Sequence, residues 1–247
     1  MKRILGTAAL LMVLAATVLT PAASAQCVTG TGTNILFKWD ANGFAYEPGY
    51  TQATYNSTVG NTMTMVSQIS LWCAPFGALN PNDPLREYTV VITGVSNGTT
   101  TAPFGSSGTK YTTLYTGGSF AVYEGSPRNA PAPTSMPSNP PNATVPSTYQ
   151  DGTVILAGAV DSLVTTITKS SFGTVNGSFR GNYTVLSGSG SSQLCQAKGG
   201  VGLMDGLWAV SGLPTGYMAH PNGKFDAPAC PVSTTPSTWG KIKALYR

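Results

Sequence analysis

The sequence predicts an all-β protein, an antiparallel β-sandwich or jelly roll with a long proline-rich loop, two disulfides and a short helical tail. Apolar and polar residues alternate with a period of two in several segments, as they do in half-buried strands. Turn sequences rich in glycine and asparagine separate these segments. Helical periodicity is nearly absent outside the two ends of the chain. Short strands joined by such turns are typical of sandwiches and jelly rolls.

The first 25 residues have the features of a secretory signal peptide. Lys2 and Arg3 form a positive start, and residues 4–20 are apolar apart from small residues. The segment Ala23-Ser24-Ala25 then supplies the small side chains that a signal peptidase recognises. Cleavage before Gln26 leaves 222 of the 247 residues. We expect this product to be secreted, extracellular or attached to the cell surface, with the periplasm as the alternative. No later stretch is long enough to span a membrane.

Charged residues are scarce and unevenly placed. They make up 9% of the chain, against roughly 25% in average soluble domains. After the signal peptide the chain holds 11 basic and 9 acidic residues, and three of the basic ones (Lys241, Lys243 and Arg247) lie in the last seven positions. The body of the protein is therefore not basic, which argues against nucleic acid as a partner.

The four cysteines predict two disulfides, because an even number of cysteines in an exported chain is usually paired. They are Cys27, Cys73, Cys195 and Cys230. Three connectivities are open. The pairs Cys27–Cys73 and Cys195–Cys230 are favoured because each lies within one half of the chain. The spacings match no zinc-binding motif.

The predicted strands follow one another along most of residues 26–236, which we expect to form one secreted domain. Residues 62–71 alternate most clearly, and Gly60-Asn61 before them is a turn sequence. Asn97-Gly98, Gly117-Gly118 and Asp161-Ser162 are expected to end strands, with a hairpin at Gly117-Gly118. The strands expected between these turns are residues 51–58, 62–71, 88–95, 111–115, 119–123, 153–160, 163–168 and 178–186.

A proline-rich segment interrupts the strand pattern. Residues 126–148 contain seven prolines, and proline cannot donate a hydrogen bond inside a sheet. The segment is either a linker between two small β domains or a long surface loop of one domain. We favour the loop, because the C-terminal half alone offers few strands for an independent core.

The last residues, 237–247, predict a basic amphipathic tail. Trp239, Ile242 and Tyr246 have helical spacing, and basic residues surround them. Ser237 or Thr238 is suited to cap the start of such a helix. Docking of this tail on its own domain is the simplest expectation, and a sorting signal or contact with an anionic surface is the alternative.

Aromatic residues near the start of the domain suggest a carbohydrate site. Trp39, Tyr46 and Tyr50 lie close together in the sequence. Secreted β-sandwich modules bind glycans by stacking sugar rings on exposed aromatic side chains, with help from amides and carboxylates. Packing in the core is the alternative role of these rings.

The same region suggests a calcium site. Asp40 and Asn42 alternate before Gly43, as the first ligands of a calcium loop do, and Glu47 follows closely. The third ligand and the distal acid of an EF-hand are missing. An Asx turn that binds no metal explains the same residues.

Few residues are suited to catalysis. His220, the only histidine, lies in the turn-like sequence Ala219-His220-Pro221-Asn222-Gly223, where a loop histidine is the simpler interpretation than a general base. The Asp-Thr-Gly and Asp-Ser-Gly signatures of aspartic proteases are absent from the sequence. Nine acids leave few combinations for a glycosidase pair. The sequence therefore names no catalytic residue and favours a non-enzymatic protein without a cofactor.

The chain resembles secreted β-rich bacterial proteins of uncharacterised function. The residues that carry the resemblance are the signal peptide, the strand Asp151-Gly152-Thr153-Val154-Ile155-Leu156, the turns rich in glycine, serine and threonine, and the terminal Trp239-Gly240-Lys241-Ile242-Lys243. This resemblance implies an extracellular or cell-surface location and no particular chemistry. We therefore expect a structural or interaction protein that binds a glycan or associates with itself. A carbohydrate-binding module is the first alternative and a secreted hydrolase the second.

Overall fold

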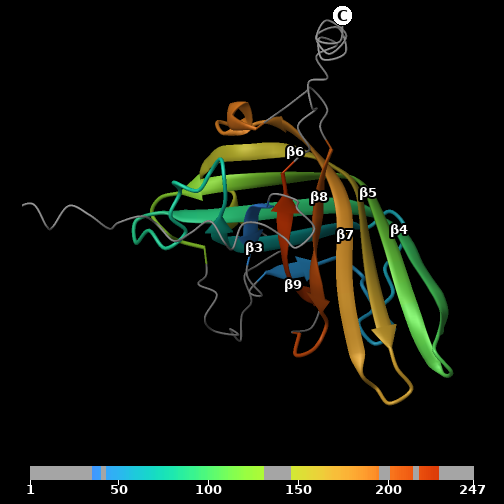
Figure 1. Cartoon of the computed structure of the whole chain (residues 1–247). Helices are drawn as coiled ribbons and strands as arrows, with labels where there is room; N and C mark the ends of the chain where they lie inside the picture. Colours follow the sequence, from blue (N-terminus) through green and yellow to red (C-terminus); the bar gives the residue numbers. More distant parts are fainter. Residues whose placement is uncertain (1–34, 40–42, 131–145, 195–200, 214–216, 228–247) are drawn as a thin grey trace, which may run out of the picture.

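The computed structural model describes residues 35–39, 43–130, 146–194, 201–213 and 217–227 (Figure 1). Two single-turn 3-10 helices, η1 (Pro146–Tyr149) and η2 (Ser191–Gln193), accompany the strands. No helix in the described part of the chain is long and apolar enough to cross a membrane. The nine strands are β1 (Ile35–Trp39), β2 (Phe44–Tyr46), β3 (Thr62–Trp72), β4 (Glu87–Phe104), β5 (Gly108–Gly125), β6 (Thr153–Lys169), β7 (Val175–Ser187), β8 (Val201–Ala209) and β9 (Tyr217–Asp226).

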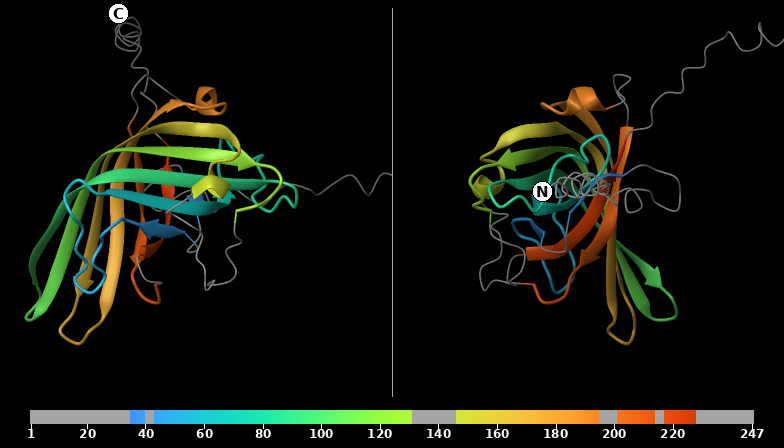
Figure 2. Two further views of the ribbon diagram at one scale, coloured as in Figure 1. Left: turned by 180° about the vertical axis from the view of Figure 1, so that it is seen from behind. Right: turned by 60° about the vertical axis from the view of Figure 1, so that its left-hand side comes forward.

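All nine strands belong to one antiparallel sheet that curls into a nearly closed ring (Figures 1 and 2). Neighbours from β3 through β9 pair in chain order, from β4 with β5 up to β8 with β9. The short strands β1 and β2 both lie between β3 and β9, one after the other along them. Because β3 also pairs with β4, the two ends of the sheet are joined.

This ring confirms the all-β antiparallel class and corrects the predicted sandwich or jelly roll. A sandwich needs two separate sheets whose inner faces pack on each other. Here a single sheet bends round, and its own inner face encloses the core. The physical reason is that β3 and β9 are hydrogen-bonded along both edges, so they leave no edge at which a second sheet begins.

The four strands β4 to β7 are the longest in the sheet and reach beyond the ring (Figure 2). β3 pairs with β4 only as far as Val95, and β8 pairs with β7 only from Ser178 onward. Beyond these points two hairpins continue as a four-stranded sheet. We call residues 97–116 and 163–177 the extension.

Three sequences expected to be turns are instead bends inside long strands. β4 runs through Asn97-Gly98, β5 through Gly117-Gly118 and β6 through Asp161-Ser162. Gly98 and Gly117 have φ angles of +86° and +60°, which suit glycine, and the strand register shifts beside these sites. Thr116 pairs with Ser162, so the bends of β5 and β6 are neighbours. Together they form a crease where the ring passes into the extension.

Of the other predictions, two strands are confirmed, and one strand and one turn are wrong. Residues 62–71 and 178–186 are strands, as β3 and β7 confirm. Residues 51–58 are turns with one isolated bridge between Thr51 and Asn56, so the strand expected there is wrong. The predicted turn around His220 is also wrong, because residues 219–223 lie inside β9.

The proline-rich segment joins β5 to β6, which pair with each other in the same sheet. Residues 131–145 of it lie outside the described part of the chain, as do the signal peptide and the tail of residues 237–247. Cys73 is buried in the core and is not a free thiol. Cys27, Cys195 and Cys230 are not among the described residues, so the two disulfides remain a prediction.

Aromatic side chains fill the interior of the closed sheet, and glycines on neighbouring strands leave space for them. Trp39 on β1 pairs with Gly223 on β9, which pairs with Gly206 on β8, which pairs with Phe179 on β7. The rings of Trp39 and Phe179 stack with centroids 5.8 Å apart and planes 24° from parallel. The two glycines between them therefore lie beneath a continuous aromatic layer.

Candidate binding face

The three aromatic residues expected to bind a glycan do not form one exposed platform. Trp39 is 2% exposed and packs on Phe179 and Phe225 in the core. Tyr46 is half-buried with its ring edge-on to Tyr217. Tyr50 is half-buried against the core, and burial raises the pKa of its phenol. Ligand binding by these residues stays a prediction. Trp39 is among the residues that line a hollow described below, but its indole ring packs in the core.

Glu47, the third expected calcium ligand, lies in a buried hydrogen-bond network. Its carboxylate is 1% exposed and accepts hydrogen bonds from Ser57 Oγ at 2.7 and 2.8 Å. The Tyr115 hydroxyl donates to it at 3.1 Å and the Thr58 N–H at 3.2 Å. Ser57 Oγ in turn lies 2.5 Å from Ser96 Oγ. The network therefore ties the segment after β2 to the inner side of β4 and β5.

The rest of the expected calcium site, Asp40 and Asn42, lies outside the described residues. Within the described ranges, no cluster of three or more histidine, cysteine, aspartate or glutamate side chains is arranged to hold a metal ion. Glu47 already has three donors, which make four contacts with its two oxygens, so its described contacts are those of a structural carboxylate.

Replacing Glu47 by alanine should lower the free energy of unfolding by about 2 kcal/mol, because it strands buried donors on Tyr115, Thr58 and Ser57. Urea unfolding of the two proteins measures the loss. Glu124→Ala is the matched control, since it removes a carboxylate whose ion pair with Arg86 is largely open to solvent. Equal losses for the two variants would contradict a structural role of the Glu47 network.

His220 lies on β9 with its ring centroid 4.2 Å from that of Phe44. Burial lowers the pKa of His220, while a backbone hydrogen bond with Gly43 acts in the opposite direction. The packing on Phe44 and the burial suit a structural role for this histidine. No ion pair joins it to an acid within the described part of the chain.

Charged side chains form a row across four strands on the outer face of the ring. Arg180 on β7 pairs with Asp205 on β8, Asp205 pairs with Lys224 on β9, and Lys224 pairs with Lys38 on β1. Strand alternation places them outside, because Met204 and Phe225 next to them point into the core. We call these four residues and Asp226 the charged row.

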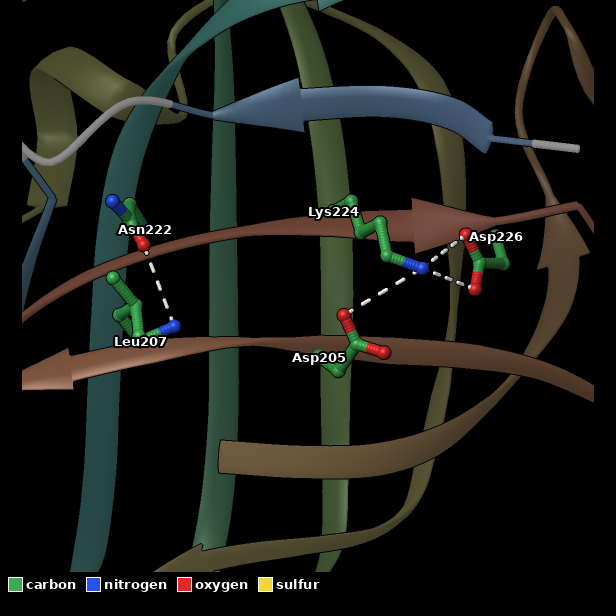
Figure 3. Close-up of polar contacts among 5 residues, drawn as sticks. All are labelled: Asp205, Leu207, Asn222, Lys224 and Asp226. Atoms are coloured by element: carbon green, nitrogen blue, oxygen red, sulfur yellow. Dashed lines mark hydrogen bonds and ion pairs between the residues drawn. The ribbon is translucent and has the colours of Figure 1, made fainter. Parts of the chain in front are cut away.

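Lys224 is the centre of this row (Figure 3). Its Nζ atom lies 2.6 and 2.7 Å from the two carboxylate oxygens of Asp226 and 3.6 Å from Asp205 Oδ1. The Asp226 side chain is 6% exposed and that of Asp205 is 43% exposed. The lysine is therefore held by a buried acid on its own strand, while Asp205 stays accessible to a ligand.

Two shallow hollows flank the point where Arg180 meets Asp205. One has a volume of about 370 Å³ and lies over β1, β9 and β8. The other has a volume of about 320 Å³ and lies over β6 and β7. The polar residues that line the first are Lys38, Ser70, Asp205, Asn222 and Lys224, and those that line the second are Ser162, Thr166, Ser178, Arg180 and Asn182.

We call the charged row and the two hollows the binding face. Asn222 supports it, because its Oδ1 accepts a hydrogen bond from the Leu207 N–H at 3.4 Å and holds β8 against β9 (Figure 3). Leu207 itself is 60% exposed, so the face also carries one apolar contact point. Its groups can hold a polar ligand by hydrogen bonds and charge.

Sequence reasoning did not single out the residues of this face. The alternation in residues 178–186 places Arg180 and Asn182 on one side, which is a usable signal. No such signal marks Asp205, since glycines replace apolar residues at several inward positions of β8. Lys224 was missed because Pro221, Asn222 and Gly223 before it have the composition of a turn.

Comparison with known proteins adds no relative. No protein-family model matches the chain, and no curated protein or solved structure matches it. The function is therefore inferred from the chain's own features, of which the first is its single β-rich sheet.

Proposed function

We propose that this protein is a secreted or cell-surface interaction protein without catalytic activity, and that it binds its partner on the binding face. The observation that supports the proposal most is the charged row from Arg180 to Lys38, which crosses four strands beside two hollows. A rigid sheet that presents polar groups in fixed register is suited to recognition. The signal-peptide features of residues 1–25 support the location.

An extracellular glycan is the partner that this chemistry suits best. Hydroxyl, amide, carboxylate and ammonium groups lie together on the face, and each can bond to sugar hydroxyls. The charged row holds three basic and two acidic residues, so a polysaccharide with carboxylates should bind more tightly than a neutral one. Contacts come from hydrogen bonds and Leu207, with no aromatic stacking on Trp39.

The position of the acids supports a binding role over hydrolysis. On the binding face, Asp205 and Asp226 are the two carboxylates, and both contact Lys224. Asp226 is almost fully buried, so it is poorly placed to reach a scissile bond. An ion cluster of this kind orients the lysine side chain towards a ligand.

A polysaccharide pull-down tests this function. The secreted chain should bind an acidic polysaccharide saturably, and the double variant Arg180→Gln/Lys38→Gln should weaken binding at least tenfold, because two charge-assisted contacts are lost. Lys169→Gln in the extension is the matched control and should bind normally. The screen is run with and without calcium, which also tests the calcium prediction at Asp40, Asn42 and Glu47. Unchanged binding by the double variant would reject this face.

A further inference from the structure

The extension ends in two hairpin tips that lie side by side (Figures 1 and 2). The β4–β5 tip closes where Phe104 pairs with Gly108, and the β6–β7 tip follows Lys169. The tips are neighbours because Thr109 pairs with Lys169. Each carries one exposed phenylalanine: Phe104 is 45% exposed and Phe172 is 96% exposed. Two large apolar rings are thus exposed at neighbouring, protruding ends of the sheet.

The charged side chains of the extension are all positive. Neither of its segments, of 20 and 15 residues, contains an aspartate or glutamate, and each contains one lysine, Lys110 or Lys169. Both lysines lie close to the tips, since Lys110 pairs with Thr168 next to Lys169. Among the described residues neither lysine forms an ion pair. Each tip therefore has one lysine close to its exposed phenylalanine in the chain, and neither lysine is paired with an acid among the described residues.

The residues around the rings are small. Ser106 and Ser107 lie in the first tip, Ser170 and Ser171 in the second, and glycines complete both turns. No bulky or acidic side chain there would keep the phenylalanines out of an apolar layer. The two turns together comprise about a dozen residues, well below the 20–30 that each side of a stable protein interface supplies.

We propose that the two tips dock the protein onto an anionic lipid surface. Phe104 and Phe172 enter the boundary between headgroups and acyl chains, and Lys110 and Lys169 lie at the level of the phosphates. Apolar anchors and charge then act together, as two weak signals do in other peripheral proteins. The binding face does not include the two tips, so it is free to hold its own partner.

Co-sedimentation with vesicles tests the proposal. The secreted chain should bind vesicles of equal parts phosphatidylcholine and phosphatidylglycerol, and should bind phosphatidylcholine alone at least tenfold more weakly. Phe104→Ser/Phe172→Ser should lower binding to the anionic vesicles at least tenfold. Lys110→Gln/Lys169→Gln should lower it about fivefold for each lysine and remove most of its salt dependence.

Two controls make the result specific. Leu85→Ser removes an exposed leucine outside the extension, whose 73% exposure lies between those of the two phenylalanines, and should leave vesicle binding unchanged. All variants should keep their melting temperature and, apart from changes on the binding face, their polysaccharide binding, so failure of docking and failure of the proposed function are told apart. Equal binding by the phenylalanine variant and Leu85→Ser overturns the proposal. A loss of self-association without any vesicle binding overturns it in favour of a second copy of the chain.

Discussion

Gly206→Ala is expected to lower the free energy of unfolding by more than about 3 kcal/mol, although it adds one methyl group. A Cβ atom at this position would lie 1.9 Å from the carbonyl oxygen of Asn222 and 2.7 Å from the ring of Phe179. The first of these neighbours is backbone of β9 and cannot move without breaking the β8–β9 pairing. Urea unfolding and the yield of folded protein measure the effect.

The control for this variant lies one residue further along β8. Leu207→Ala changes an outward side chain that is 60% exposed, and its effect should stay within about 1 kcal/mol. Gly158→Ala should behave like Gly206→Ala, because its Cβ would meet the Thr184 carbonyl oxygen at 1.9 Å and the Phe120 ring at 2.7 Å. A fully stable Gly206→Ala protein would show that the aromatic layer does not require glycine beneath it.

The second large effect is a loss of stability in alkali. Burial raises the pKa of four phenols above the usual value near 10, and a neighbouring carboxylate adds to the shift in each case. They are Tyr50 and Tyr115 beside Glu47, Tyr149 beside Glu87 and Tyr183 beside Asp226. The buried carboxylates and phenols thus share three sites in the core.

The direction of the effect follows from these raised values. Below pH 10 the phenols are protonated in both states, so the native protein keeps its full stability. Above pH 10 the unfolded chain loses these protons and the native protein retains them, so stability falls as pH rises. Each group costs about 1.4 kcal/mol at one pH unit above its unfolded pKa, and four groups about 5 kcal/mol.

Unfolding free energies from urea titrations at pH 9 and pH 11 measure this loss, and phenolate absorbance should rise together with unfolding. Tyr149→Phe is the informative variant, because its dependence on pH should be about a quarter smaller. A stability that stays flat over this range would show that these phenols ionise in the native protein.

Much of the fold followed from the period-two pattern, and the three errors at expected turns have one physical cause. The sequences Asn97-Gly98, Gly117-Gly118 and Asp161-Ser162 combine the residues that turns require with those that bulges require. Local sequence cannot separate a chain reversal from a bend, because the difference depends on which strand pairs next. Hydrogen bonds that continue across the bends join the expected strands 111–115 and 119–123 into β5, and 153–160 and 163–168 into β6.

The binding face shows the same limit more strongly. Asp205, Lys224 and Arg180 are far apart in sequence and meet only through the register of three strands. Trp39, by contrast, was singled out for its residue type. The glycines opposite it leave space for the indole, which therefore packs in the core. Residue type alone predicted a sugar-binding role for an aromatic side chain that packs in the core. It did not identify the charged residues, because strand pairing brings them together.

The closure of the ring determines when folding can be completed. Ile35 pairs with Asp226, so the first and last described strands are partners across 190 or so residues of chain. Until β9 has emerged, β1, β2 and β8 have open edges that can pair with other chains. Contacts of such long sequence separation form slowly. The protein is therefore expected to complete its fold only after the whole chain is available, and to depend on protection from aggregation until then.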